Sequence, residues 1–185
     1  MCIRDRHVAV AVVARFDAQA ELARRLGAQM VLAHEPRLAV IEELVGWGGG
    51  RLRQPLLGLP MAYPGAVDVV YDTVGKPETF EVGVRVLKAR GTLVKAGVHA
   101  PGRWEWSPLY FKEINWVGAN AFGVEEVDGQ RKHAIEHYLD LVVHERVDLC
   151  TMLTHTFRLE QWRDAFLAIA NQGDSGAVKV AIDFR

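Results

Sequence analysis

The chain has 185 residues, of which 50% are hydrophobic and 24% are charged, as in an ordinary globular domain. Its net charge of −1 gives no electrostatic basis for binding nucleic acid or an anionic membrane. Two cysteines are too few for a disulfide framework, and no apolar run reaches the ~20 residues of a membrane span. We therefore expect a cytoplasmic protein that binds neither nucleic acid nor membranes.

The first six residues, MCIRDR, carry charge but lack the apolar core of a secretory signal. They resemble translated adaptor sequence, and we interpret residues 1–6 as a non-native leader. On this interpretation the sequence begins, truncated, at His7.

The first part of the chain alternates between strand-like and helix-like segments. Residues 7–14 are rich in β-branched side chains and predict a buried strand. A helix should follow from a cap at Asp17 to a stop at Gly27, and residues 30–33 predict a second strand. We expect another helix at 39–45 and then a long loop over residues 46–64.

The alternation continues in the middle of the chain. The apolar run Val67–Asp72 predicts a strand, followed by a helix over 77–89 that Pro77 opens and Gly91 closes. Residues 92–96 predict the next strand. Alternating residues at 103–106 indicate a short strand, and residues 114–121 predict another.

In the last third of the chain the order of predicted elements changes. A long helix is expected from about residue 128 to 144, then a strand near 152–156, a helix over 159–170 and a final strand at 177–182. Strands that alternate with helices favour a parallel sheet whose carboxyl ends share one edge, where a ligand would bind. The fold class is therefore α/β, half of a nucleotide-binding sheet.

Two motifs in the sequence are weak. The run GWGGGR at residues 46–51 fails the G-x-G-x-x-G spacing and does not join a strand to a helix, so it predicts a flexible turn. The segment from His133 to His137 matches H-x-x-E-H, which can bind zinc when a third ligand follows. No such ligand motif follows, and a solvated helix face is the better interpretation.

Arg15 directly follows the first predicted strand. Nucleotide-binding sheets usually place an acidic residue there to bind the ribose hydroxyls of the cofactor. An arginine instead suits a 2′-phosphate, which it can bind through two hydrogen bonds. A surface arginine at a strand end is the equally weighted alternative.

Five segments in this order resemble the second half of a medium-chain dehydrogenase/reductase, the zinc-dependent alcohol and threonine dehydrogenase superfamily. They are ARFDAQAELARRLGA (14–28), VDVVYDTVG (67–75), GTLVKAGV (91–98), WVGANAFG (116–123) and SGAVKVAI (175–182). The resemblance implies a partial Rossmann sheet in order 3-2-1-4-5-6, with position 1 and its glycine loop missing. Residues 7–14 would occupy position 2, and Val67–Asp72 position 4.

The resemblance also implies which residues contact an NAD(P) cofactor. At positions that match the family, the resemblance implies that Thr73 and Val74 lie beneath the cofactor riboses and that Lys179 reaches the pyrophosphate. The residues by the nicotinamide and its carboxamide would be Ala96, Gly97, Val98, Ala119 and Ala121. Small residues suit these places because a ring must approach the backbone closely. The alternative is ordinary packing at sheet ends. With Arg15 included, NADP is favoured over NAD.

The same resemblance assigns regions and an activity. Residues 7–123 would form the partial NAD(P)-binding domain, 124–150 a connecting helix, and 151–185 a tail that returns to the catalytic domain. The expected reaction is hydride transfer between the nicotinamide and an alcohol or carbonyl substrate. The family's zinc ligands and proton relay precede this sequence, so we assign no catalytic or metal-binding residue, and we expect these residues alone to be inactive.

Three alternatives stay open at this point. One is a zinc-free quinone or enoyl reductase of the same superfamily. Another is a methyltransferase, although Arg15 offers no acid for its cofactor, and the third is a non-catalytic nucleotide-binding module. The resemblance also implies a homodimer of the full-length enzyme, with Arg103–Ser107 at the interface and Trp104 and Trp106 on the same face of a strand.

Overall fold

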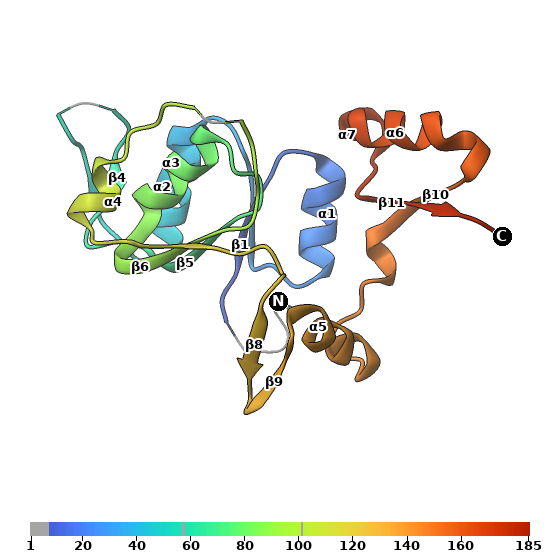
Figure 1. The fold of residues 1–185 in the computed structure, drawn as a ribbon. Coiled ribbons are helices and arrows are strands. Elements are labelled where there is room, and N and C mark those ends of the chain that lie inside the picture. Colours follow the sequence, from blue (N-terminus) through green and yellow to red (C-terminus); the bar gives the residue numbers. More distant parts are fainter. Residues whose placement is uncertain (1–7, 57, 101) are drawn as a thin grey trace. The chain divides into compact units, whose positions relative to one another are not determined.

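The computed structural model describes residues 8–56, 58–100 and 102–185 (Figure 1). They group into two compact units, one of residues 35–121 and the other combining residues up to 34 with those from 122 onward. The predicted non-native leader, residues 1–6, lies outside the described residues.

The unit of residues 35–121 is built on a parallel sheet of three strands, β5 (Val67–Asp72), β6 (Leu87–Lys95) and β7 (Asn115–Gly118). Strand β6 lies in the middle and pairs in parallel with both neighbours. All three strands were predicted from their apolar runs. However, β6 begins at Leu87, within the segment predicted as helix.

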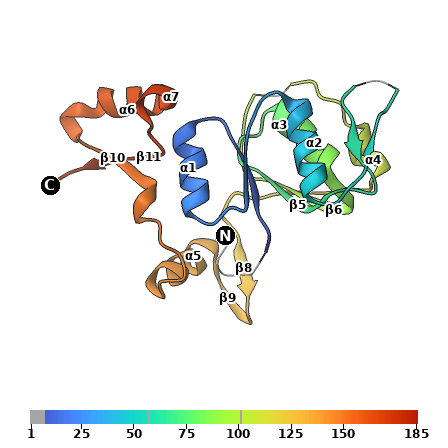
Figure 2. The same ribbon diagram turned by 180° about the vertical axis from the view of Figure 1, so that it is seen from behind.

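Three helices accompany this sheet, α2 (Arg37–Trp47), α3 (Pro77–Val86) and α4 (Ser107–Phe111). Helices α2 and α3 lie side by side in both views (Figures 1 and 2). The apolar side of α3 packs on the sheet and forms a buried core, which consists of Phe80, Val84, Leu87, Leu93 and Ile114. Because α3 begins five residues after the end of β5, its start lies at the carboxyl ends of the strands.

Helix α3 ends earlier than the sequence predicts. Pro77 occupies its first turn, as expected, because a proline there gives up no hydrogen bond. The helix stops at Val86 and not at residue 89, because Leu87 is already extended with ψ of 146°. The buried ammonium of Lys112 donates to the carbonyls of Arg85 and Leu87 at 3.0 and 2.6 Å, which replaces the hydrogen bonds of a further helical turn.

The segment predicted as a long loop, residues 46–64, contains a small hairpin. Its strands are β3 (Leu52–Arg53) and β4 (Met61–Ala62), paired antiparallel. The glycine run before it ends α2, and a side chain at Gly48 would collide with the backbone of Ala66. These glycines therefore allow two backbone segments to pack closely, which the sequence prediction of a flexible turn did not foresee.

The strand predicted at residues 103–106 is absent from the described structure. This segment is irregular and leads into α4, whose N-cap is Trp106 with helical backbone angles. The two tryptophans therefore do not share a strand face. Trp104 packs against Phe80 with ring centroids 4.1 Å apart, whereas Trp106 is 60% exposed.

The other unit begins with β1 (Ala11–Ala14) and β2 (Met30–Ala33), which form a parallel pair joined by α1 (Asp17–Arg25). These elements confirm the sequence prediction, although Asp17 is the first helical residue and the N-cap is Phe16. Two parallel strands joined by a helix are the arrangement expected of a Rossmann fold. The predicted fold class, a partial Rossmann α/β arrangement, is confirmed.

The long helix predicted from residue 128 is wrong at its beginning. A hairpin of β8 (Val124–Val127) and β9 (Gln130–His133) precedes a shorter helix, α5 (Ala134–Val143). The turn consists of Asp128 and Gly129, both with positive φ, 52° and 75°. An Asp-Gly pair between two strands is the usual signal for this turn, and the sequence prediction overlooked it.

The last part of the chain forms a second parallel pair, β10 (Leu153–Arg158) and β11 (Lys179–Asp183). Between them lie the helices α6 (Trp162–Ala170) and α7 (Gln172–Ser175), shown in red in Figure 2. Two 3₁₀ turns, Cys150–Met152 and Leu159–Gln161, flank β10. The predicted strand, helix and strand are all present with shifted ends. No helix within the described ranges is long and apolar enough to cross a membrane.

Candidate cofactor site

The carboxyl ends of β5, β6 and β7 meet at one edge of their sheet. The strand register aligns Asp72 with Lys95 and Lys95 with Gly118, so the chain leaves all three strands at the same level. The amides of Ala96 and Gly97 both donate to the Asp72 carbonyl, at 3.0 and 2.9 Å. The Ala119 amide donates to the Lys95 carbonyl at 2.9 Å. These hydrogen bonds connect the three segments that follow the strands into one continuous edge.

Asp72 organises the first of these segments. Its side chain is buried, and Oδ1 accepts hydrogen bonds from the amides of Val74 and Gly75 at 3.1 and 2.8 Å. The Thr79 hydroxyl donates to the same oxygen at 3.0 Å and links the turn to α3. Sequence reasoning missed this role, although an aspartate that accepts from amides two and three residues later is a recognised turn former.

The glycines of the edge allow the first two segments to touch. A side chain at Gly97 would collide with the backbone of Thr73 and Val74, and Gly75 in turn faces the Gly97 carbonyl. Gly75 also has φ of +79°, which favours glycine. The need for small residues here was predicted, but the contact that the structure shows is between two backbone segments.

The structure brings seven of the nine predicted cofactor residues together at this edge. Gly97 is buried, and the other six are exposed at the ends of the strands, namely Thr73, Val74, Ala96, Val98, Ala119 and Ala121. Val98 is 91% exposed. The edge therefore presents small side chains and backbone to solvent, a surface that a flat ring can approach.

The remaining two predicted residues belong to the other unit. Arg15 directly follows β1, is exposed, and places its guanidinium 5.1 Å from the ring centroid of Phe16. Its backbone amide donates to the side chain of Gln19 at 3.3 Å. Lys179 is the exposed first residue of β11, and its carbonyl accepts a hydrogen bond from the Thr154 hydroxyl at 3.1 Å.

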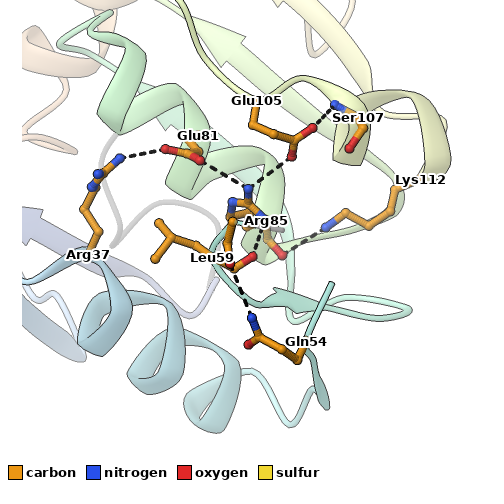
Figure 3. Close-up of polar contacts among 9 residues, drawn as sticks. Arg37, Gln54, Leu59, Glu81, Arg85, Glu105, Ser107 and Lys112 are labelled. Carbon is orange, nitrogen blue, oxygen red and sulfur yellow. Dashed lines mark hydrogen bonds and ion pairs between the residues drawn. The ribbon is translucent and has the colours of Figure 1, made fainter. Parts of the chain in front are cut away.

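A network of charged side chains centred on Arg85 joins α3 to α2 and to the segment before α4 (Figure 3). The fully buried guanidinium of Arg85 binds Glu81 and Glu105 at 3.2 and 3.1 Å and donates to the Leu59 carbonyl. Glu81 also pairs with Arg37 of α2 at 2.6 Å. The second oxygen of Glu105 accepts from the Ser107 amide at 2.8 Å. The network therefore fixes the segment around residue 105 to α3.

Lys112 is a second buried cation beside this network. Its ammonium donates to the backbone carbonyls of Ala62, Arg85 and Leu87. Burial, and secondarily the charge of Arg85, lowers the pKa of Lys112 to about 7. Sequence reasoning assigned no role to this lysine.

The H-x-x-E-H segment caps a helix. His133 is the N-cap of α5, where its Nδ1 accepts from the Ile135 amide at 3.2 Å and its own amide donates to Glu136 at 2.9 Å. Among the described residues, no three His, Cys, Asp or Glu side chains form a group that could bind a metal ion. The motif is therefore explained by helix capping.

Comparison with known proteins identifies the family. The sequence model of the zinc-binding dehydrogenase family matches residues 4–143. The chain belongs to this family. It is similar to an alcohol dehydrogenase of Cupriavidus necator, with 30% identity over 166 residues that cover 90% of this chain and 40% of the relative.

Solved structures show the same fold. A putative zinc-binding dehydrogenase from Sinorhizobium meliloti 1021 bound to NADP aligns with a TM-score of 0.64 and 24% identity, over 95% of this chain and 45% of that one. A short chain alcohol dehydrogenase from E. coli CFT073 complexed with NADH gives 0.70 and 18%, over 98% and 47%. The chain thus spans less than half the length of these relatives. The predicted resemblance to the second half of a medium-chain dehydrogenase/reductase is confirmed.

Proposed function

We propose that this chain forms the cofactor-binding half of an NADP(H)-dependent alcohol dehydrogenase. The observation that carries the proposal is the common edge of β5, β6 and β7, where small exposed residues follow three aligned parallel strands. Open α/β sheets bind their ligands at this kind of edge. The family and the alcohol dehydrogenase relative make a nicotinamide cofactor the chemical class that fits.

In this proposal the chain positions the cofactor, which supplies or accepts the hydride when bound. Thr73 and Val74 would hold the riboses, and the backbone of Ala96–Val98 and of Ala119 and Ala121 would hold the nicotinamide carboxamide. The exposed backbone and small side chains at these positions support this role. In the other unit, the exposed cation of Lys179 suits a pyrophosphate.

The catalytic step itself is assigned to no residue of this chain. The described residues contain no metal-binding group, and no zinc ligand is proposed among them. We propose that these 185 residues alone do not oxidise alcohols, whereas the full-length protein does. The proposed substrate is an alcohol or a carbonyl compound.

Cofactor choice provides the test. Arg15 is exposed directly after β1, and a guanidinium is the side chain that suits a 2′-phosphate. In the full-length protein we expect kcat/KM to be higher with NADPH than with NADH. Arg15→Asp should lower the NADPH value about tenfold or more, because two charge-assisted hydrogen bonds are lost and a like charge faces the phosphate.

Arg24→Asp is the matched control, because Arg24 is an exposed arginine of the adjacent helix α1. It makes the same change in net charge and should leave the cofactor ratio unchanged. A native preference for NADH that Arg15→Asp does not alter would contradict the assignment of NADP.

A further inference from the structure

A cavity of about 170 Å³ lies within the unit of residues 35–121, between the start of α3, the end of β6 and strand β7. Its lining includes Lys76, Phe80, Lys95, His99, Trp104 and Trp116. The cavity lies beside the candidate cofactor edge but is lined by different side chains. Nothing in the proposed function assigns a role to it.

Three aromatic rings form one wall. The ring of Phe80 lies 4.1 Å from that of Trp104 and 4.9 Å from that of Trp116, measured between centroids. The two tryptophans are 6.4 Å apart and perpendicular. The rings come from α3, from the segment before α4 and from β7, so the wall depends on the folded unit. Such a wall favours a flat apolar group, because aromatic rings pack well edge to face.

The charged side chains of the lining all have one sign. Two lysines and a histidine line the cavity, and none of the described residues that line it is acidic. The Lys95 ammonium lies 5.8 Å from the Phe80 ring centroid and makes one long hydrogen bond, of 3.4 Å, to the Gly75 carbonyl. By contrast, Lys88 of the same strand is paired with Asp68 at 2.8 Å. Within the described part of the chain, Lys95 forms no ion pair with a carboxylate.

We propose that this cavity binds a small aromatic carboxylate, with its ring against Trp104 and Trp116 and its carboxylate on Lys95. The size fits, since an engineered cavity of about 150 Å³ holds one benzene ring. The charge fits as well, because a partly buried ammonium gains a charge-assisted hydrogen bond from an anion. The proposal is independent of the cofactor assignment, because it needs no nicotinamide.

The test is calorimetric titration of the full-length protein with benzoate and with benzamide, its uncharged analogue of the same shape. We expect saturable benzoate binding with a Kd of about 1 mM, and binding of benzamide weaker by about tenfold. Lys95→Met keeps the apolar stem and should weaken benzoate about tenfold. Lys88→Met removes a lysine of the same strand outside the cavity and should bind as the native chain does.

A second measurement locates the ligand. In amide and indole NMR spectra, benzoate should shift the indole N–H signals of Trp104 and Trp116 and leave that of Trp162 in place. Absence of saturable binding, equal affinity for benzoate and benzamide, or shifts confined to other residues would each overturn the proposal. If Lys95→Met does not fold, the ratio of the two ligands on the native chain decides the question.

Discussion

Lys112 is a buried lysine of the sheet unit whose charge is desolvated by the fold. Its ammonium is buried among backbone carbonyls and beside the cation of Arg85, and no carboxylate contacts it in the described structure. The pKa of Lys112 therefore falls to about 7 in the folded chain, from about 10.4 in an unfolded one. Lys112 joins the end of α3 to the residue that follows α4, and this contact requires the ammonium to lose its hydration.

This shift predicts a pH dependence of stability. Between about pH 7 and pH 10 the unfolded chain binds a proton at Lys112 that the folded chain has released, so the free energy of unfolding rises with pH. The contribution is at most about 1.4 kcal/mol per pH unit. Urea denaturation at several pH values should show this rise in the native chain and its loss in Lys112→Met.

The control is Lys88→Met, which removes an exposed lysine paired with Asp68. Its stability should follow the same pH profile as the native chain. Parallel profiles for the native chain and Lys112→Met would show that Lys112 does not titrate in this range, whatever their absolute stabilities.

At the scale of the elements, the candidate edge depends on close contact between the segments that follow β5 and β6. A methyl group at Gly97 would collide with the backbone of Thr73 and Val74. Because the colliding atoms are backbone, no side-chain rotation can relieve the collision. We expect Gly97→Ala to lower the free energy of unfolding by about 2 kcal/mol or more, as overpacking does. It should also weaken cofactor binding, since the edge is displaced.

Gly118 provides a matched control, because it ends β7 at the same edge and no atom lies within 4 Å of a methyl group placed there. Gly118→Ala should change the stability by less than about 1 kcal/mol. Thermal and urea denaturation of both variants test the contrast. Equal losses for the two glycines would contradict the close packing of the edge.

The sequence predicted the elements whose signal is local. Val67–Asp72 and the helix that Pro77 opens follow from an apolar run and a start signal, and the alignment of strand ends follows from parallel pairing. Because parallel strands end at one edge, the sequence could predict that the seven edge residues lie together. Asp128-Gly129 was equally local, and the hairpin there was missed only because the helical pattern was extended across it.

Other features depend on contacts that no local pattern encodes. Lys112 ends α3 from 25 residues further along the chain, at the Leu87 carbonyl. Arg85 pairs with Glu105 across 20 residues, and Trp104 turns inward onto Phe80 while Trp106 stays exposed. A sequence indicates that such side chains are polar or aromatic, but only tertiary packing decides which of them are buried.

At the scale of the whole molecule, we predict that the full-length protein is a homodimer with Arg103–Ser107 at its interface. Glu105 holds this segment in place through its ion pair with Arg85 and its hydrogen bond from the Ser107 amide. In the same part of the chain, Trp106 is 60% exposed, and Tyr110 and Phe111 of α4 are each 68% exposed. Exposed aromatic side chains on a well-fixed segment are typical of interface anchors.

Trp106→Asp should therefore raise the dimer dissociation constant at least about tenfold, since a charge would replace a buried ring. Trp106 is the appropriate site, because Trp104 packs on Phe80 and its loss would damage the fold. Trp162→Asp is the matched control, with a ring 47% exposed on α6 in the other unit. Analytical ultracentrifugation of the three proteins measures the effect. A monomeric native protein would contradict the predicted homodimer. A dimer that tolerates Trp106→Asp and dissociates with Trp162→Asp would place the interface elsewhere.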